Sequence, residues 1–172
     1  ININNTNILN GISINNIDIS GLSKEEATNK ISNIIQNKKD KNLNIKIDSE
    51  NEVTTTFDYL EVNYNLSNCI NDAFNVGRSS NIFKNNFEIF NLLFNKKNLN
   101  LNIEINNDKL NSLINELSSN LENKVVQNSY YIENNKLIIT KGQSGDVVNA
   151  EDLSKNLYNV LNNLSSDENC IQ

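Results

Sequence analysis

The chain has 172 residues, of which 37% are hydrophobic, and its 21 acidic and 15 basic side chains give a net charge of −6. This length and apolar content suit one sizeable core and exclude a disordered chain. No basic stripe suggests nucleic acid as a partner, and no apolar run approaches the ~20 residues that span a bilayer. Because neither an initiator Met nor a signal peptide is present, we expect a piece of a longer protein, with any export signal or anchor outside it.

The first half of the chain is predicted to run strand, helix, hairpin, helix. Isoleucines alternate with polar residues over residues 12–19, which is typical of one or two strands broken at Asn15-Asn16. Ser23 and Glu26 form a capping box, which predicts the start of a helix. The next elements are a hairpin with strands at residues 43–47 and 53–57, and helices at residues 66–74 and 82–94.

The same order of elements is predicted to repeat in the second half. In chain order it has a strand at residues 99–105, a helix at 110–121, a hairpin near 126–132 and 137–140, and a helix at 153–164. The tail from Ser165 is polar, so we expect it to be frayed. The sequence thus predicts an α+β fold of about five helices, in which two strand-helix-hairpin-helix halves, residues 1–95 and 96–172, have antiparallel sheets covered by helices. The two halves are expected to form either two similar lobes or one continuous domain.

Catalytic and metal sites are not expected. The chain contains no His, which excludes Ser–His and Cys–His dyads, an imidazole base and His metal ligands. The pairs Glu25-Glu26 and Glu151-Asp152 lie in first helical turns, where the helix dipole favours negative charge. A glycan-directed hydrolase would need two convergent carboxylates in a cleft. We therefore predict a protein that is not an enzyme and has no cofactor.

Cys69 lies on the apolar stripe of its predicted helix. Buried free cysteines are common, and a reactive thiol needs an exposed, electropositive setting. We predict a buried, unbridged Cys69. A disulfide with Cys170 is the alternative.

Arg78 is the one arginine in the chain, and it follows a predicted helix and Gly77, a candidate for the residue after the helix C-cap. Its planar fork of donors grips carboxylates in a way that lysine cannot. The alternative is that Arg78 binds helix carbonyls or a structural acid. We expect its guanidinium at the junction of the two halves, close to Tyr64 and to the turn at residues 142–145.

Two further segments are candidates for ligand binding. Lys141 and Ser144 belong to a Gly-rich turn that leads into the last helix, where N–H groups and the helix N-terminus favour anions. A plain strand-to-helix turn is the alternative. Tyr64 could stack on a sugar ring or simply fill a strand. The predicted ligand-binding residues are Arg78, Ser79, Asn81, Tyr64, Lys141 and Ser144.

Three segments together resemble a known pattern. Residues 11–27 (GISINNIDISGLSKEEA) resemble the opening signature of VanW-type, or YoaR-like, cell-wall proteins. Residues 63–83 resemble the family's Tyr-Asn and Gly-Arg stretch, and residues 137–145 resemble its closing turn before the last helix. Asn16 and Ser80 stand where the family usually has Gly, and Lys141 stands where it usually has Pro.

This resemblance implies a non-catalytic, extracytoplasmic module that binds peptidoglycan or its precursors. The family is found on the outer face of Gram-positive-type membranes, with VanW domains or ahead of L,D-transpeptidase catalytic domains. The module would position such a neighbouring domain and would be held at the membrane or wall by segments outside it. The alternative is a structural spacer or protein-interaction domain between a membrane anchor and a catalytic domain.

Overall fold

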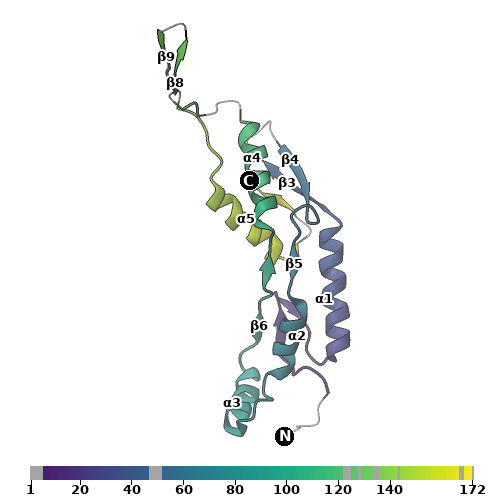
Figure 1. Cartoon of the computed structure of the whole chain (residues 1–172). Coiled ribbons are helices and arrows are strands. Elements are labelled where there is room, and N and C mark those ends of the chain that lie inside the picture. Colours follow the sequence, from purple (N-terminus) through teal and green to yellow (C-terminus); the bar gives the residue numbers. More distant parts are fainter. Residues whose placement is uncertain are drawn as a thin grey trace.

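The computed structural model describes residues 6–46, 52–121, 125–127, 129–133, 136–142, 144–166 and 169–171. These residues form an elongated α+β molecule, with α2 and α3 toward one end and the β8–β9 hairpin at the other (Figure 1). The described part contains the five helices α1 (Lys24–Lys39), α2 (Leu66–Asn75), α3 (Ile82–Leu92), α4 (Asn107–Ser119) and α5 (Ala150–Asn162). The predicted α+β class is therefore confirmed.

The strands of the described part are short. They are β1 (Ile12–Ile14), β2 (Ile17–Asp18), β3 (Asn42–Lys46), β4 (Glu52–Thr56), β5 (Asn63–Tyr64), β6 (Lys97–Leu99), β7 (Ile103–Glu104), β8 (Ser129–Glu133), β9 (Lys136–Thr140) and β10 (Cys170–Ile171). They form two three-stranded sheets, β2-β1-β6 and β10-β3-β4, and two strand pairs, β5-β7 and β8-β9.

The sheets are mixed, not purely antiparallel as predicted. β6 runs parallel to β1, and β10 runs parallel to β3. Side-chain alternation is the same for both strand directions, so periodicity alone could not reveal this. In three pairings, β1-β6, β3-β10 and β5-β7, one strand comes from each predicted half. The two predicted halves therefore share their sheets. The division of the chain into two parts at residues 95–96 stays a prediction.

A two-residue turn joins β1 to β2. Ile14 is paired with Ile17, and both intervening residues have a positive φ, 44° for Asn15 and 64° for Asn16. Two such residues are what a tight hairpin turn of the primed type requires, and Asn tolerates this conformation best after Gly. Asn16 therefore serves at a position where the resembling proteins usually have Gly.

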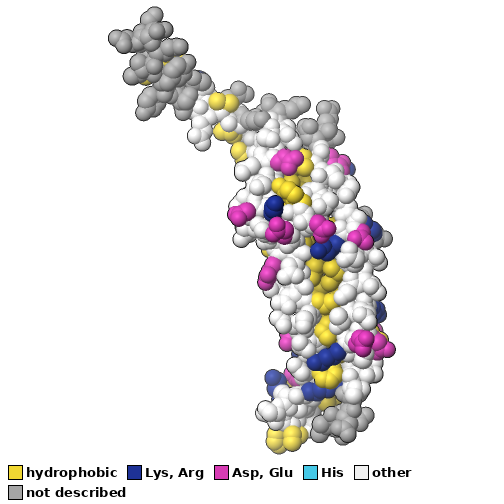
Figure 2. All heavy atoms as spheres, turned by 45° about the vertical axis from the view of Figure 1, so that its right-hand side comes forward, with side chains coloured by type: hydrophobic (Ala, Val, Ile, Leu, Met, Phe, Trp, Pro, Cys, Tyr) yellow, Lys and Arg dark blue, Asp and Glu magenta, His cyan; other side chains and the backbone are white. Residues whose placement is uncertain are grey.

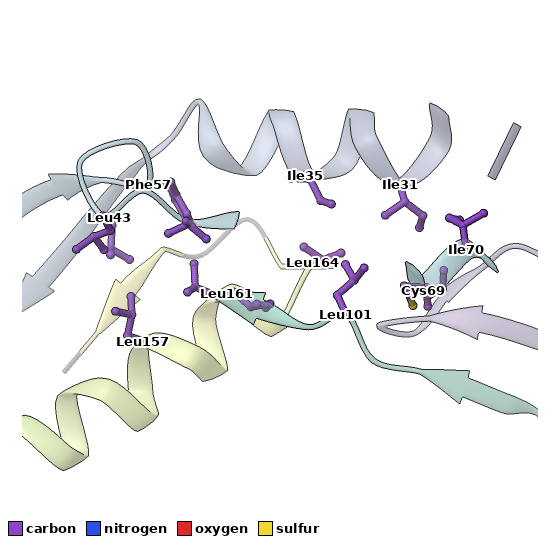
Figure 3. Packing of buried hydrophobic residues seen from close by; sticks show 14 of the residues in the cluster. Ile31, Ile35, Leu43, Phe57, Cys69, Ile70, Leu101, Leu157, Leu161 and Leu164 are labelled. Atoms are coloured by element: carbon purple, nitrogen blue, oxygen red, sulfur yellow. The ribbon is translucent and has the colours of Figure 1, made fainter. Parts of the chain in front are cut away.

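A single cluster of buried side chains runs along the molecule. Figure 3 shows how Ile31 and Ile35 of α1 face Leu101 and Leu164 of the later chain. The capping box predicted at the start of α1 is present, because Ser23 accepts from the Glu26 N–H and the Glu26 carboxylate accepts from the Ser23 N–H. Local capping thus fixes where α1 begins, and its apolar stripe docks it on the core.

Two predicted features near the strands are wrong. Residues 99–105 are not one strand: they contain only the end of β6 and, separately, β7. The break arises because the Leu101 N–H donates to the buried Asn15 side chain where a continued strand would pair with backbone. The tail is ordered at residues 169–171: Asn169 and Ile171 are buried, and the Asn169 carbonyl accepts from the Asn44 N–H. Ile171, an apolar residue in this polar tail, belongs to the edge strand β10 that pairs with β3. The polar composition of the tail did not indicate this pairing.

Candidate functional site

A pocket of about 440 Å³ lies where β3, β10, α4 and α5 meet. Its apolar lining comes from Ile45, Leu117, Leu121, Val147, Val148, Leu153 and Ile171, and its polar lining comes from Lys46, Asp146, Asn149, Asp152 and Asn156. Concave sites that combine an apolar floor with a few polar groups are the usual form of a small-ligand site. We take this pocket as the candidate binding site.

The start of α5 shapes one wall of the pocket. Asn149 is the N-cap of this helix, and its side-chain oxygen accepts from the N–H groups of Glu151 and Asp152. Its amide donates to the Asp152 carboxylate over 2.6 Å. These bonds hold Asp152 in a capping role, as predicted for an acid in a first helical turn.

Two opposite charges lie on the rim. Lys46 ends β3, and Asp146 lies in the segment that leads into α5. Within the part of the chain that the structure describes, neither side chain takes part in a hydrogen bond or an ion pair. Both are therefore available to a ligand that carries a carboxylate and an ammonium group. No cluster of three or more metal-ligating side chains is present among the described residues.

Arg78 lies elsewhere, between α2 and α3. Its guanidinium donates to the backbone carbonyls of Phe74 and of Asn7, the latter over 2.6 Å, and it stacks on the Phe74 ring at 4.2 Å. The predicted position near Tyr64 and residues 142–145 is wrong. Gly77, with a φ of +69°, turns the chain back, so the fork reaches the end of its own helix and the amino-terminal segment. These contacts favour the structural alternative for Arg78.

Ser79 and Asn81 lie beside Arg78 and serve the start of α3. Asn81 is the N-cap, accepting from the Lys84 N–H. Ser79 donates its hydroxyl and its N–H to the Asn85 side chain, both over 2.7 Å. Their polar groups are thus engaged within the loop and the first turn of the helix.

The remaining predicted site residues lie apart from this cluster. Tyr64, in β5, is half-buried and donates its hydroxyl to the Leu161 carbonyl over 3.2 Å, and burial raises the pKa of its phenol. Lys141 and Ser144 are exposed in the segment between β9 and α5, far along the molecule from α2 and α3 (Figure 1). The structure therefore brings together Arg78, Ser79 and Asn81. As ligand contacts, all six residues stay predictions.

We expect Arg78→Lys to lower the free energy of unfolding by about 1–2 kcal/mol, because an ammonium cannot bond both carbonyls and stack on Phe74 at once. Thermal and urea unfolding measure this effect. Lys84→Gln, at an exposed cation nearby, is the control and should be neutral. If Arg78→Lys kept full stability but weakened ligand binding, the ligand role predicted from the sequence would be favoured instead.

The two thiols differ in burial. Cys69 is buried and unbridged, as predicted, and Cys170 is exposed and also free. The Cys69 thiol contacts the Asn100 carbonyl at 3.8 Å. Burial, followed by the nearby Asp72 carboxylate, raises the pKa of Cys69 to about 11. A raised pKa means that the folded state holds this proton more tightly, so its stabilising contribution is complete below about pH 9 and is lost as the pH rises toward 11.

Alkylation should therefore distinguish the two thiols. With iodoacetamide at pH 8, we expect native protein to be labelled at Cys170 at least about tenfold faster than at Cys69, since only an accessible thiolate reacts. Mass spectrometry of tryptic peptides measures both rates, and urea-unfolded protein is the control, in which the rates should converge. Rapid native labelling of Cys69 would show that α2 opens readily.

Sequence reasoning missed the pocket. Of its lining, the residues Asp146, Val147 and Val148 follow directly on the Gly-rich turn, yet none of them is among the predicted ligand-binding residues. The sequence signal that could have indicated the pocket is the apolar pair Val147-Val148, which lies between a Gly-rich turn and a helix N-cap. Apolar side chains in such a segment are expected to contact a neighbouring surface.

The structure is that of a small α+β domain with a candidate ligand pocket. The chain belongs to the family described as "Putative peptidoglycan binding domain", whose model matches residues 53–169, more than half of the chain. This match confirms the resemblance to a peptidoglycan-binding domain that the sequence motifs predicted. The matched range holds most of the pocket lining, whereas Ile45, Lys46 and Ile171 lie outside it.

The family match identifies a binding domain, and no catalytic family was found. Neither the curated proteins nor the solved structures gave a match. Among the described residues, no helix has the length and apolar character needed to cross a membrane.

Proposed function

We propose that this chain is a non-catalytic cell-wall binding module whose pocket between β3, β10, α4 and α5 takes part of a peptidoglycan stem peptide. The family match supports peptidoglycan as the class of ligand. Stem peptides present carboxylates, ammonium groups and methyl side chains along a short length. Lys46 and Asp146 on the rim, above the apolar floor, are complementary to that sequence of groups.

Retention on insoluble sacculi tests this function. We expect wild-type protein to sediment with sacculi, and Lys46→Gln combined with Asp146→Asn to lower retention by about tenfold, the effect of losing two solvent-exposed ion pairs worth roughly 0.7 kcal/mol each. The control is Lys155→Gln with Glu116→Gln, a pair of exposed residues outside the pocket that also leaves the net charge unchanged. Wild-type retention no better than that of an unrelated acidic domain would contradict the function. Retention undiminished in the pocket variant would contradict the site alone.

We place this module outside the cytoplasmic membrane of a Gram-positive-type cell, attached to membrane or wall through segments outside it. The resemblance to VanW-type and YoaR-like proteins supports this context, and so does peptidoglycan as the ligand of the family. In the same context, the module positions a neighbouring VanW or L,D-transpeptidase domain against its substrate. The sequence that flanks this chain in the intact protein tests this part of the proposal.

A spacer between a membrane anchor and a catalytic domain is the second candidate function. The elongated shape favours it, because the molecule is long and narrow and its first described residues lie near the α3 end, where Asn7 contacts Arg78 (Figure 1). The two candidates differ in sacculus retention, which a pure spacer would lack.

A further inference from the structure

The outward surface of α3 is unusually apolar. Six large hydrophobic side chains at this helix and just after it are exposed: Ile82 by 69%, Phe83 by 88%, Phe87 by 70%, Phe90 by 61%, Leu93 by 74% and Phe94 by 73%. We call these six residues the aromatic tip. Its four phenylalanines are spaced by four, three and four positions, so they lie along one side of the helix. An exposed apolar surface of this extent marks an interaction site.

A different side of α3 attaches the helix to the body. Ile89 packs so close to Gly77 that a Cβ built there would lie 2.9 Å from the Ile89 side chain. The Leu92 carbonyl would lie 3.2 Å from a Cβ at Gly11, and Leu92 packs against the core. Because Ile89 and Leu92 already seat the helix, the aromatic tip is not needed for folding.

The charge around the tip is opposite to that of the rest of the molecule. Residues 77–98 hold four basic side chains and one acidic side chain, a net charge of +3, which leaves −9 for the remainder of a chain whose total is −6. Lys84, Lys96 and Lys97 are all exposed. Figure 2 shows apolar atoms at the lower end of the molecule, the end of α3 in Figure 1, with basic side chains close above them.

We propose that the aromatic tip inserts into the interfacial layer of an anionic lipid bilayer, with the three lysines at the headgroup phosphates. Phenylalanines flanked by lysines have the character of an interfacial anchor, and the 11-residue α3 is too short to span. The acidic body would be repelled from the anionic surface, which favours end-on binding. A second copy fits less well, because a symmetric contact would bring the two +3 regions together.

Vesicle co-sedimentation tests the proposal on the full chain. Wild-type protein should sediment with vesicles of phosphatidylcholine containing about 30% phosphatidylglycerol and much less with pure phosphatidylcholine, and salt should weaken the binding. Phe83→Ser, Phe87→Ser and Phe90→Ser together should lower the partition coefficient by at least about tenfold, since three buried rings are lost. The matched control is Leu137→Ser in β9, an exposed apolar residue at the other end of the molecule.

The basic residues are tested in the same way. Replacing Lys84, Lys96 and Lys97 by Gln should lower binding to the anionic vesicles, whereas the same change at Lys41, Lys109 and Lys155 should not, because those lysines, which are exposed or partly exposed, lie outside the tip. Circular dichroism verifies that each variant folds. Retention on sacculi should be unchanged in the Phe and Lys variants of this region. A failure of the lipid proposal can therefore be distinguished from a failure of the proposed peptidoglycan binding.

A tryptophan at position 90 reports insertion directly. The chain has no Trp, so Phe90→Trp gives a single signal, which should shift to shorter wavelength when anionic vesicles are added. Three results would overturn the proposal: no sedimentation of wild-type protein with anionic vesicles, equal sedimentation of the triple Phe variant, or a dimer in analytical ultracentrifugation that the Phe changes abolish.

Discussion

Replacing Asn15 by Leu is expected to lower the free energy of unfolding by about 3–4 kcal/mol, a large loss for one side chain. The Asn15 side chain is only 5% exposed and holds two distant segments. Its oxygen accepts from the Leu101 N–H, and its amide donates to the Asn162 carbonyl, each over 2.8 Å. Leu would leave both backbone groups without these partners and would be strained at a φ of 44°.

Two further variants separate these causes. Asn15→Gly keeps the positive φ without strain and loses only the hydrogen bonds, so we expect a cost of about 2 kcal/mol. Asn16→Gly, the matched control one residue away, should be neutral or slightly stabilising, because that turn position favours Gly. Urea unfolding at equilibrium measures all three. Equal stability of Asn15→Gly and wild type would show that water replaces the Asn15 side chain, and the joining role assigned to it would be wrong.

Features set by neighbouring residues could be predicted from the sequence. The capping box of Ser23 and Glu26 closes within one turn, as does the Asn81 cap. Gly77 adopts the positive φ expected after a helix end. Buried Cys69 follows from the apolar stripe of α2. Each of these depends on residues a few positions away, where spacing and propensity are informative.

Features set by distant residues could not be predicted in the same way. Nothing in the alternation of β1 and β6 specifies that they run parallel, and nothing local indicates that Ile171 completes the sheet edge at β3. The pocket combines β3, β10, α4 and α5, so no single motif encodes it. The predicted position of Arg78 is wrong because a long side chain can reach several segments, and only the path of the backbone selects among them.

Cutting the chain at residues 95–96 is expected to leave two pieces that do not fold alone. Residues 1–95 would lose β6 from β1, β7 from β5 and β10 from β3, which exposes the backbone groups of three strands. The core would be divided as well, because side chains from both pieces face each other in it (Figure 3). We expect each piece to lack a cooperative thermal transition, and mixing the two to restore one.

A protease site inserted after Asn95 in the intact chain is the control, since α3 ends at Leu92 and β6 begins at Lys97. After cleavage, the two pieces should stay associated and keep the spectrum of the folded protein, because the strand pairings are not covalent. Circular dichroism and size-exclusion chromatography measure both properties. A cooperative transition for residues 1–95 by themselves would show instead that the first half is a domain in its own right. The second half would then dock on a preformed surface, and the shared strands would be an interface between two folded units, not the core of one.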